Sequence, residues 1–213
     1  MSNEDLVQGS EAWFAARLGV ITASRLADIM KKTKYNESTY KTRLRFQLAI
    51  ERVSGKSASD TVMNKAMYDG VEREPDARTL FEAVTGKEVA LCGSFDHPTI
   101  VNTSASPDGL LRGENAVLEI KSPTHSTHAK NLMSDTMPKN YIYQVQWQIA
   151  CTESDYAYFA SYHPDYPPEL RLKWVKVEKD DSVIKSLEEA VRQFDIEIED
   201  LIIKIQNGGN KNG

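Results

Sequence analysis

Three charged residues near the middle of the chain have the types and the spacing that could hold a metal ion against a phosphate. Asp108 lies in the segment SPDGL (106–110), and Glu119 and Lys121 lie two positions apart in the apolar segment LEIK (118–121). Mg²⁺ favours one or two carboxylates, keeps several waters and takes its remaining ligands from substrate phosphate oxygens. Two carboxylates and one lysine therefore suffice to act on a phosphate ester.

The residues between these two segments predict a hairpin that brings the charges together. Residues 112–115 (RGEN) are typical of a four-residue hairpin loop, because Gly and Asn tolerate the backbone angles of a chain reversal. A symmetric loop places Asp108 directly opposite Glu119, where Cβ atoms lie roughly 4.5–5.5 Å apart. Side chains alternate along a strand, so we expect Lys121 on the same face as Glu119.

Each part of this pattern also has an ordinary explanation. A Glu-x-Lys pair on a strand is commonly a solvated face, and Asp followed by Gly is commonly a turn. Val117, Leu118 and Ile120 instead indicate a largely buried strand. An isolated charge in such a strand is costly unless it is paired or bound to a metal. We therefore interpret the three charged residues as a metal site.

The surrounding pattern predicts an α/β fold in which helices flank a central mixed β-sheet. Glycines and capping hydroxyls mark the expected helix ends. Helices are expected over residues 11–18, 38–53, 67–84, 139–151 and 181–206, and another should begin near Thr22 or Ser24. Strands are expected near residues 87–91 and 99–105, in the hairpin, and near 155–162 and 170–178. We expect a single domain over residues 1–206 and a disordered Gly/Asn-rich tail over 207–213.

Composition narrows the class of protein. A chain of 213 residues with 40% hydrophobic content can bury one sizeable core. It has no apolar run of about eighteen residues and no signal-like N-terminus, so we expect an intracellular protein with no membrane partner. Two cysteines, Cys92 and Cys151, exclude a disulfide framework and a four-cysteine metal site. The histidines show no ligand pattern and are expected in loops or at the surface: His97, His125, His128 and His163.

The net charge of −5 is unusual for a protein that contacts phosphates, but the charges are unevenly distributed. Residues 17–56 hold ten Lys or Arg against three acids, a balance of +7, whereas residues 178–200 hold nine acids against three bases, a balance of −6. This asymmetry predicts that the N-terminal third faces nucleic acid and that the acidic segment faces away. The alternative is that both are ordinary solvated helix faces.

Five segments in a fixed order resemble the PD-(D/E)xK nucleases and, more narrowly, the phage lambda-type exonucleases of the viral recombinase exonuclease group. The segments have spacing similar to the family's and span most of the chain: WFAARLGVITAS (13–24), GVEREPDARTLFE (70–82), SPDGL (106–110), LEIKSP (118–123) and QVQ (144–146). The resemblance implies a restriction-endonuclease-like core and a metal-dependent DNA exonuclease.

The resemblance also implies a ligand set for the metal. Asp108, Glu119 and the backbone carbonyl of Ile120 would bind Mg²⁺, for which Mn²⁺ can substitute, with Glu74 close to the same ion or to a second one. By pattern alone Glu74 is one of several exposed acids. Lys121 would orient or help deprotonate the attacking water, and we expect its pKa to be lowered by the cation and by partial burial.

Further residues gain roles from the resemblance. Gln144, by pattern only a boundary residue beside an apolar helix face, would help to complete the active site. Arg17, Ser24 and Ser106 would bind the 5′-terminal phosphate, since a guanidinium can hold a phosphate in two-point contact. Without the resemblance Arg17 is an ordinary surface arginine. We expect Trp13 to belong to the core rather than to stack on a base.

The activity implied by the resemblance is 5′→3′ digestion of one strand of linear double-stranded DNA with 5′-phosphate ends. It would release 5′-mononucleotides and leave 3′ single-stranded overhangs for phage-type homologous recombination by strand annealing. The family also implies a homotrimer ring, a single-strand annealing protein as partner, and a bacteriophage or prophage protein in the bacterial cytoplasm. Two alternatives remain: a non-catalytic DNA-end or recombination-partner binding module with the same fold, and a sequence-specific endonuclease.

An apolar seam in the last expected helix offers a surface for such a partner. Its members recur at steps of three and four residues: Ile184, Leu187, Val191, Phe194, Ile198, Leu201 and Ile205. We expect this seam to pack mainly on its own domain, with contact to a partner as the alternative for its exposed side.

Overall fold

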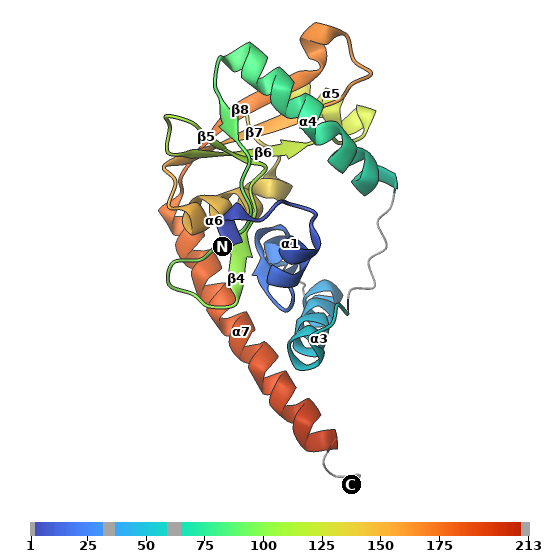
Figure 1. Cartoon of the computed structure of the whole chain (residues 1–213), viewed down its shortest axis with the longest axis vertical. Helices are drawn as coiled ribbons and strands as arrows, with labels where there is room; N and C mark the ends of the chain where they lie inside the picture. Colours follow the sequence, from blue (N-terminus) through green and yellow to red (C-terminus); the bar gives the residue numbers. More distant parts are fainter. Residues whose placement is uncertain (1–2, 32–36, 59–64, 210–213) are drawn as a thin grey trace.

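The computed structural model describes residues 3–31, 37–58 and 65–209 (Figure 1). Its α-helices are α1 (Glu11–Ala16), α2 (Leu26–Met30), α3 (Thr39–Ser54), α4 (Lys65–Thr85), α5 (His125–Leu132), α6 (Ile142–Thr152) and α7 (Asp181–Gly209). Short 3₁₀ helices are η1 (Asn3–Asp5), η2 (Ala23–Arg25), η3 (Lys139–Tyr141) and η4 (Pro168–Leu170). The strands are β1 (Ile21–Thr22), β2 (Val89–Ala90), β3 (Phe95–Asp96), β4 (Thr103–Ala105), β5 (Gly109–Leu111), β6 (Ala116–Lys121), β7 (Tyr156–Tyr162) and β8 (Leu172–Glu178).

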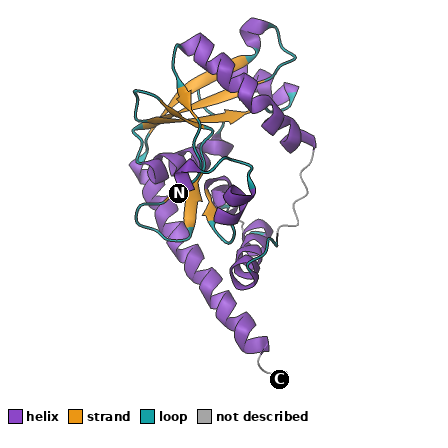
Figure 2. Ribbon diagram, viewed as in Figure 1, coloured by secondary structure: helices purple, strands orange, loops and turns teal. Residues whose placement is uncertain are grey.

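These strands form two sheets with helices packed around them (Figure 2). The larger sheet has the order β2-β5-β6-β7-β8, and it is mixed because β6 and β7 run parallel while the other neighbours are antiparallel. The smaller sheet has the order β1-β4-β3. The mixed sheet flanked by helices confirms the expected α/β fold. The smaller sheet was not expected.

Helices cover both faces of the larger sheet. Phe81 of α4 shares a buried cluster with Leu118 of β6, whereas Val145 of α6 shares another with Val117. Adjacent residues of β6 therefore point to opposite faces, as the alternation of side chains along a strand requires. This strand is buried on both sides, which is why its sequence is almost continuously apolar.

The apolar seam of helix α7 packs in the core of its own domain. Leu187, Val191, Phe194 and Ile198 are fully buried in a cluster with residues of α2, α3 and α6, whereas Ile205 near the end of the helix is 39% exposed. The prediction that the seam packs on its own domain is confirmed for these residues. The helix runs three residues beyond its predicted end at 206, into the segment expected to be disordered, and residues 210–213 lie outside the described part of the chain.

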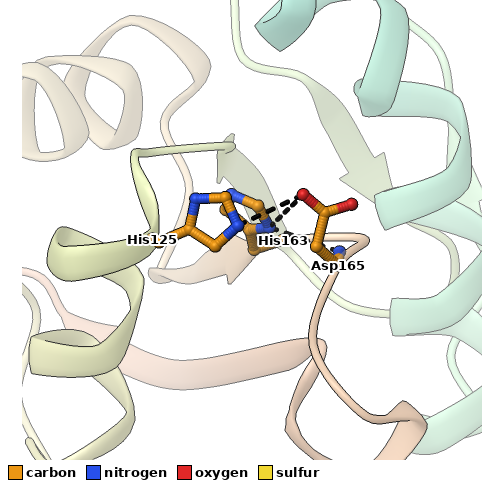
Figure 3. A group of neighbouring side chains, drawn as sticks. All are labelled: His125, His163 and Asp165. Atoms are coloured by element: carbon orange, nitrogen blue, oxygen red, sulfur yellow. Dashed lines mark hydrogen bonds and ion pairs between the residues drawn. The ribbon is translucent and has the colours of Figure 1, made fainter.

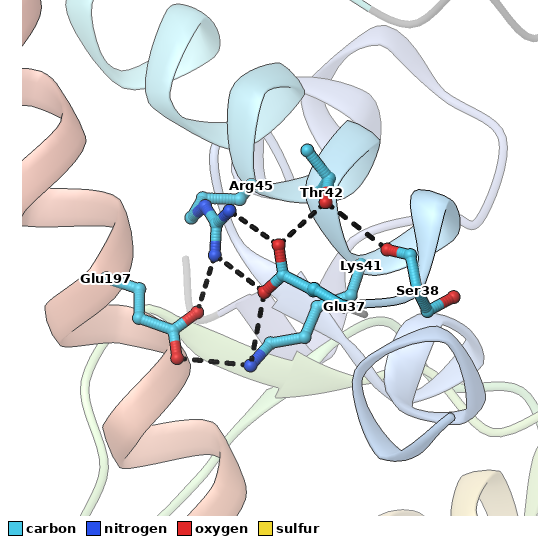
Figure 4. A network of polar contacts seen from close by, with 6 residues as sticks. All are labelled: Glu37, Ser38, Lys41, Thr42, Arg45 and Glu197. Carbon is cyan, nitrogen blue, oxygen red and sulfur yellow. Dashed lines mark hydrogen bonds and ion pairs between the residues drawn. The ribbon is translucent and has the colours of Figure 1, made fainter. Parts of the chain in front are cut away.

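The basic and acidic segments neutralise each other. In the contact between α3 and α7, Arg45 Nη1 lies 2.9 Å and Lys41 Nζ 3.1 Å from the carboxylate of Glu197 (Figure 4). Further along, Arg52 Nη2 lies 2.7 Å from Asp195 Oδ1. The acidic segment therefore packs on part of the basic one and neutralises it, which the predicted separation of the two segments did not include, and the prediction that the N-terminal third faces nucleic acid stays untested.

Two further local features bear on the expectations. Pro75 lies inside α4, within the helix that was expected over residues 67–84. His97 and His163 are buried but lie in loops, and His125 is exposed, so the expectation of loop or surface positions holds for these three and is wrong only for His128, which is buried inside α5. In the described part of the chain no helix is long and apolar enough to cross a membrane.

Candidate active site

The β5–β6 hairpin has the predicted register. Gly109 pairs with Leu118, which is the register that places Asp108 opposite Glu119. The carboxylate of Asp108 is held in place by the neighbouring strand, because its Oδ2 accepts a hydrogen bond from the backbone N–H of Ile120 at 2.6 Å. The hairpin therefore presents one carboxylate from each strand at the same end of the ladder.

Gly109 serves close packing rather than a turn. It lies inside β5, and a Cβ atom at this position would overlap Cγ1 of Val89 and lie 3.2 Å from the carbonyl oxygen of Ala90. The alternative that Asp108-Gly109 forms a simple turn is therefore wrong. Only glycine lets β2 approach β5 this closely beside the metal-binding candidate.

Glu119 is 1% exposed and lies at the centre of a cluster of polar contacts. The ammonium of Lys121 contacts its Oε1, as the predicted shared face requires, and the side-chain amide of Gln144 also donates to Oε1. The fully buried Gln148 donates to the other oxygen, Oε2. Gln148 was not predicted to be a site residue. Its signal in the sequence is its position one helical turn after Gln144, which directs both amides to the same carboxylate.

Glu74 reaches the same site from α4. Its carboxylate contacts the guanidinium of Arg78 one turn later, and it lies within electrostatic range of Glu119 and Lys121. Burial raises the pKa of Glu74, opposed by the charge of Arg78 and reinforced by that of Glu119. The structure therefore brings together Glu74 and the hairpin residues, which are far apart in the sequence.

The charges of the site perturb one another strongly. Burial raises the pKa of Asp108 well above its usual range, and the negative charge of Glu119 raises it further. Burial by itself would lower the pKa of Lys121, but the charges of Glu119 and Asp108 outweigh it and the pKa is raised. Burial therefore does not lower the Lys121 pKa against these charges, and its lowering by a bound cation stays a prediction.

This donor set suits a hard divalent cation. Glu74, Asp108 and Glu119 offer carboxylate oxygens, which are the ligands that Mg²⁺ and Mn²⁺ prefer. Their mutual repulsion, visible in the raised pKa of Asp108, is the kind of electrostatic strain that a bound cation relieves. The residues fit such an ion. The role of the Ile120 carbonyl as a ligand stays a prediction.

A second cationic centre lies next to this hairpin. Arg17 Nη1 donates to Ser106 Oγ at 2.8 Å, and its guanidinium lies 4.2 Å from the ring centre of Trp13. Burial lowers the pKa of Arg17 to about 10, so the side chain stays cationic at neutral pH. Trp13 is half-buried and supports Arg17, which differs from the core position that we expected.

The smaller sheet aligns the remaining phosphate-binding candidates. Thr22 of β1 pairs with Ser104 of β4, and Ser24 and Ser106 each follow two residues later. Both hydroxyls therefore leave the same end of this sheet, where Ser24 is exposed. Because Asp108 follows Ser106 by two residues, this end of the sheet adjoins the metal-binding candidates.

Two side chains of α3 hold the turn that follows Arg17. Gly19 has a φ of +70°, and its peptide is bound on both sides: Glu51 Oε2 accepts its N–H at 3.0 Å, and Arg52 Nε donates to its carbonyl at 2.9 Å. A side chain at Gly19 would also crowd Arg52. Helix α3 thus contributes to the site by holding the segment that carries Arg17.

Several other cations of the basic segment are paired with acids. Besides the residues of α3 that pair with α7, Arg25 pairs with Asp28 at 3.1 Å, and the predictions for Lys32 and Lys34 fall outside the described residues.

Comparisons with known proteins agree with this geometry. A family model described as a YqaJ-like viral recombinase domain matches residues 12–155, which include every residue assigned above to the site. An alkaline exonuclease (LHK-Exo) from Laribacter hongkongensis is 35% identical, with a TM-score of 0.87 over 96% of this chain and 100% of that chain. Its complex with dAMP is similar over the same shares of both chains at 36% identity and the same TM-score.

A more distant solved structure supports the fold alone. A phage related exonuclease from Haemophilus somnus 129PT has a TM-score of 0.68 over 87% of this chain and 96% of that chain, at 16% identity. No curated protein matches the chain.

Proposed function

We propose that this chain, which belongs to the YqaJ-like viral recombinase family, digests one strand of linear duplex DNA from the 5′ end. Its family membership makes it a DNA exonuclease that acts in recombination. The observation that carries this proposal is the position of Arg17 and Ser106 beside Asp108. A cation at that place can bind a terminal phosphate while the adjacent phosphodiester reaches the carboxylates. The products would be 5′-mononucleotides and a 3′ single-stranded overhang.

The carboxylates of Asp108 and Glu119, with Glu74 near them, would hold Mg²⁺ or Mn²⁺. When bound, such an ion supplies charge neutralisation at the phosphate and a more acidic water. Lys121 contacts Glu119 and would hold the attacking water and take part in its proton transfer. Gln144 and Gln148 orient Glu119 by donating to its two oxygens.

Recognition of the 5′-phosphate would rest on Arg17, Ser24 and Ser106. The guanidinium of Arg17 is cationic, half-buried and stacked on Trp13, so little side-chain entropy remains to be lost when it binds a phosphate. The dAMP bound to the Laribacter exonuclease supports a 5′-mononucleotide as the product.

The wider biology is proposed from the family. We infer a homotrimer ring around DNA, a single-strand annealing protein that loads onto the overhang, and action in the cytoplasm of a bacterial host. Exposed apolar residues on α3 and on the C-terminal half of α7 offer surface for such contacts: Phe46, Ile50, Val53, Ile196 and Ile203.

A binding module that keeps the fold is the second candidate, and an assay with linear and closed circular duplexes separates it from the enzyme. With 5′-phosphorylated linear DNA and Mg²⁺, the exonuclease removes one strand, and both EDTA and Lys121→Ala prevent this. Binding of linear DNA without strand loss would support the module instead. Cleavage of closed circles would indicate an endonuclease.

A further inference from the structure

A second group of metal-ligand side chains lies outside the hairpin site. His125 begins α5, and His163 and Asp165 follow the end of β7 (Figure 3). Their ligand atoms all lie within 4.8 Å of one another. His125 Nε2 is 3.2 Å and His163 Nδ1 is 4.0 Å from Asp165 Oδ2.

The Nδ1 atom of His163 can bind an ion if it gives up one hydrogen bond that it now accepts. This Nδ1 accepts a hydrogen bond of 3.3 Å from the backbone N–H of Asp165, which assigns the lone pair to Nδ1. A neutral imidazole is the form that binds metals.

The two donor separations that involve Asp165 are close to those of a tetrahedral site. Zinc binds imidazole nitrogen and carboxylate oxygen at about 2.0–2.2 Å, so donors in a tetrahedron lie roughly 3.3–3.5 Å apart. The His125–Asp165 separation already has this size. The His163–Asp165 separation must shorten by about 0.6 Å, and the His125–His163 separation, which is within 4.8 Å, must shorten by up to about 1.4 Å. The side chains of His125 and Asp165 are 66% and 61% exposed, so they can move while the buried His163 stays in place.

The backbone around the group is held in place by other contacts. The N–H of His163 donates to the carbonyl of Arg171 at 2.9 Å, and Arg171 Nε donates to the carbonyl of Tyr166 at 2.9 Å. The hydroxyl of Tyr166 donates to the carbonyl of His125 at 2.8 Å. The loop after β7 is therefore already joined to the start of α5, which reduces the ordering that an ion would have to impose.

We propose that His125, His163 and Asp165 form a zinc site, with a water as the fourth ligand. Two imidazoles and one carboxylate suit Zn²⁺, whereas Mg²⁺ prefers a set made only of oxygens, so this site and the hairpin carboxylates select different metals. The role of the zinc site is to hold the ends of the adjacent strands β6 and β7 together. His125 follows the last residue of β6, Lys121, by four positions, and β6 and β7 pair up to Lys121 and Ser161.

The test is a calorimetric titration of tag-free, metal-stripped, full-length protein with Zn²⁺ in a large excess of Mg²⁺, which occupies the hairpin carboxylates. We expect one Zn²⁺ site that His125→Ala and Asp165→Ala each weaken by at least the roughly 10–100-fold that loss of a supporting residue costs at metal sites. Asp135→Ala is the matched control, because Asp135 is a fully exposed carboxylate beside Lys173 and should leave the affinity unchanged. No Zn²⁺ binding, or equal binding in all variants, overturns the proposal.

A second measurement does not depend on calorimetry. Co²⁺ bound to imidazole in a four-coordinate site absorbs visible light far more strongly than Co²⁺ bound by six oxygens. The wild type and Asp135→Ala should show these strong bands and a Zn²⁺-dependent rise in Tm, and His125→Ala should lose both. Strong bands that persist in His125→Ala would place the metal elsewhere and overturn the assignment.

Discussion

Gln148→Leu should separate catalysis from stability at the hairpin site. Gln148 is fully buried, and its amide donates to Glu119 Oε2, so the substitution removes one donor from a buried carboxylate. A hydrogen bond to a charged group contributes about 1.5–3 kcal/mol. The other end of the same side chain opposes this, because Gln148 Oε1 has no hydrogen-bond partner among the described residues and its burial costs about 1–3 kcal/mol. Leucine removes that cost, so the free energy of unfolding should change by no more than about 2 kcal/mol.

The two opposing contributions of Gln148 to stability do not cancel in the reaction rate. If Gln148 orients Glu119 during the reaction, loss of its hydrogen bond of about 1.5–3 kcal/mol lowers kcat roughly 10–150-fold with little change in KM. The assay is steady-state hydrolysis of a 5′-phosphorylated linear duplex in saturating Mg²⁺, beside urea unfolding of the same preparation. A folded Gln148→Leu protein with wild-type kcat would refute the positioning role. Loss of both activity and more than about 3 kcal/mol of stability would refute the cancellation.

Three further predictions concern other parts of the chain. Arg17→Ala should reduce the preference in kcat/KM for 5′-phosphate over 5′-hydroxyl ends by about 10–150-fold, the equivalent of one charged hydrogen bond, and an unchanged ratio would remove Arg17 from the phosphate pocket. Burial lowers the pKa of His128 below its unfolded value, so its contribution to stability is present above about pH 6.5 and is lost as the pH falls, because the unfolded chain then binds the proton. Urea unfolding from pH 7.5 to about 5 should therefore show a shallower pH slope in His128→Gln; the same slope in both proteins would contradict it. Arg52→Met should destabilise the chain by about 1–3 kcal/mol in thermal or urea unfolding, because Asp195 and the Gly19 carbonyl lose their donor, and a wild-type midpoint would show that these contacts contribute little.

The hairpin could be predicted from the sequence because its determinants are local. A four-residue loop with Gly113 fixes the register, and alternation along the strand then places Lys121 beside Glu119. The long helices α3 and α7 were also predicted to within a few residues, since Gly55 ends α3 in the left-handed conformation and the apolar seam extends along α7.

Tertiary placement could not be predicted in the same way. Glu74 and Arg17 reach the hairpin from distant segments, and nothing in their own neighbourhood distinguishes them from surface residues, so only the resemblance to a family identified them. The packing of the acidic segment on the basic one was missed for the same reason, because the sequence does not say that α3 and α7 pack on each other. The strands of the smaller sheet have two or three residues each, which is too short for any periodicity to show.

The measurement that tests the central claim most directly follows the two ends of one duplex. A linear 5′-phosphorylated DNA carries one label at the 5′ end and, in a separate preparation, one label at the 3′ end of the same strand, and each is incubated with the protein and Mg²⁺. The account predicts that the 5′ label appears at once as a labelled mononucleotide, while the 3′ label stays in progressively shorter strands. Immediate release of the 3′ label, with the 5′ label retained in long fragments, would contradict it.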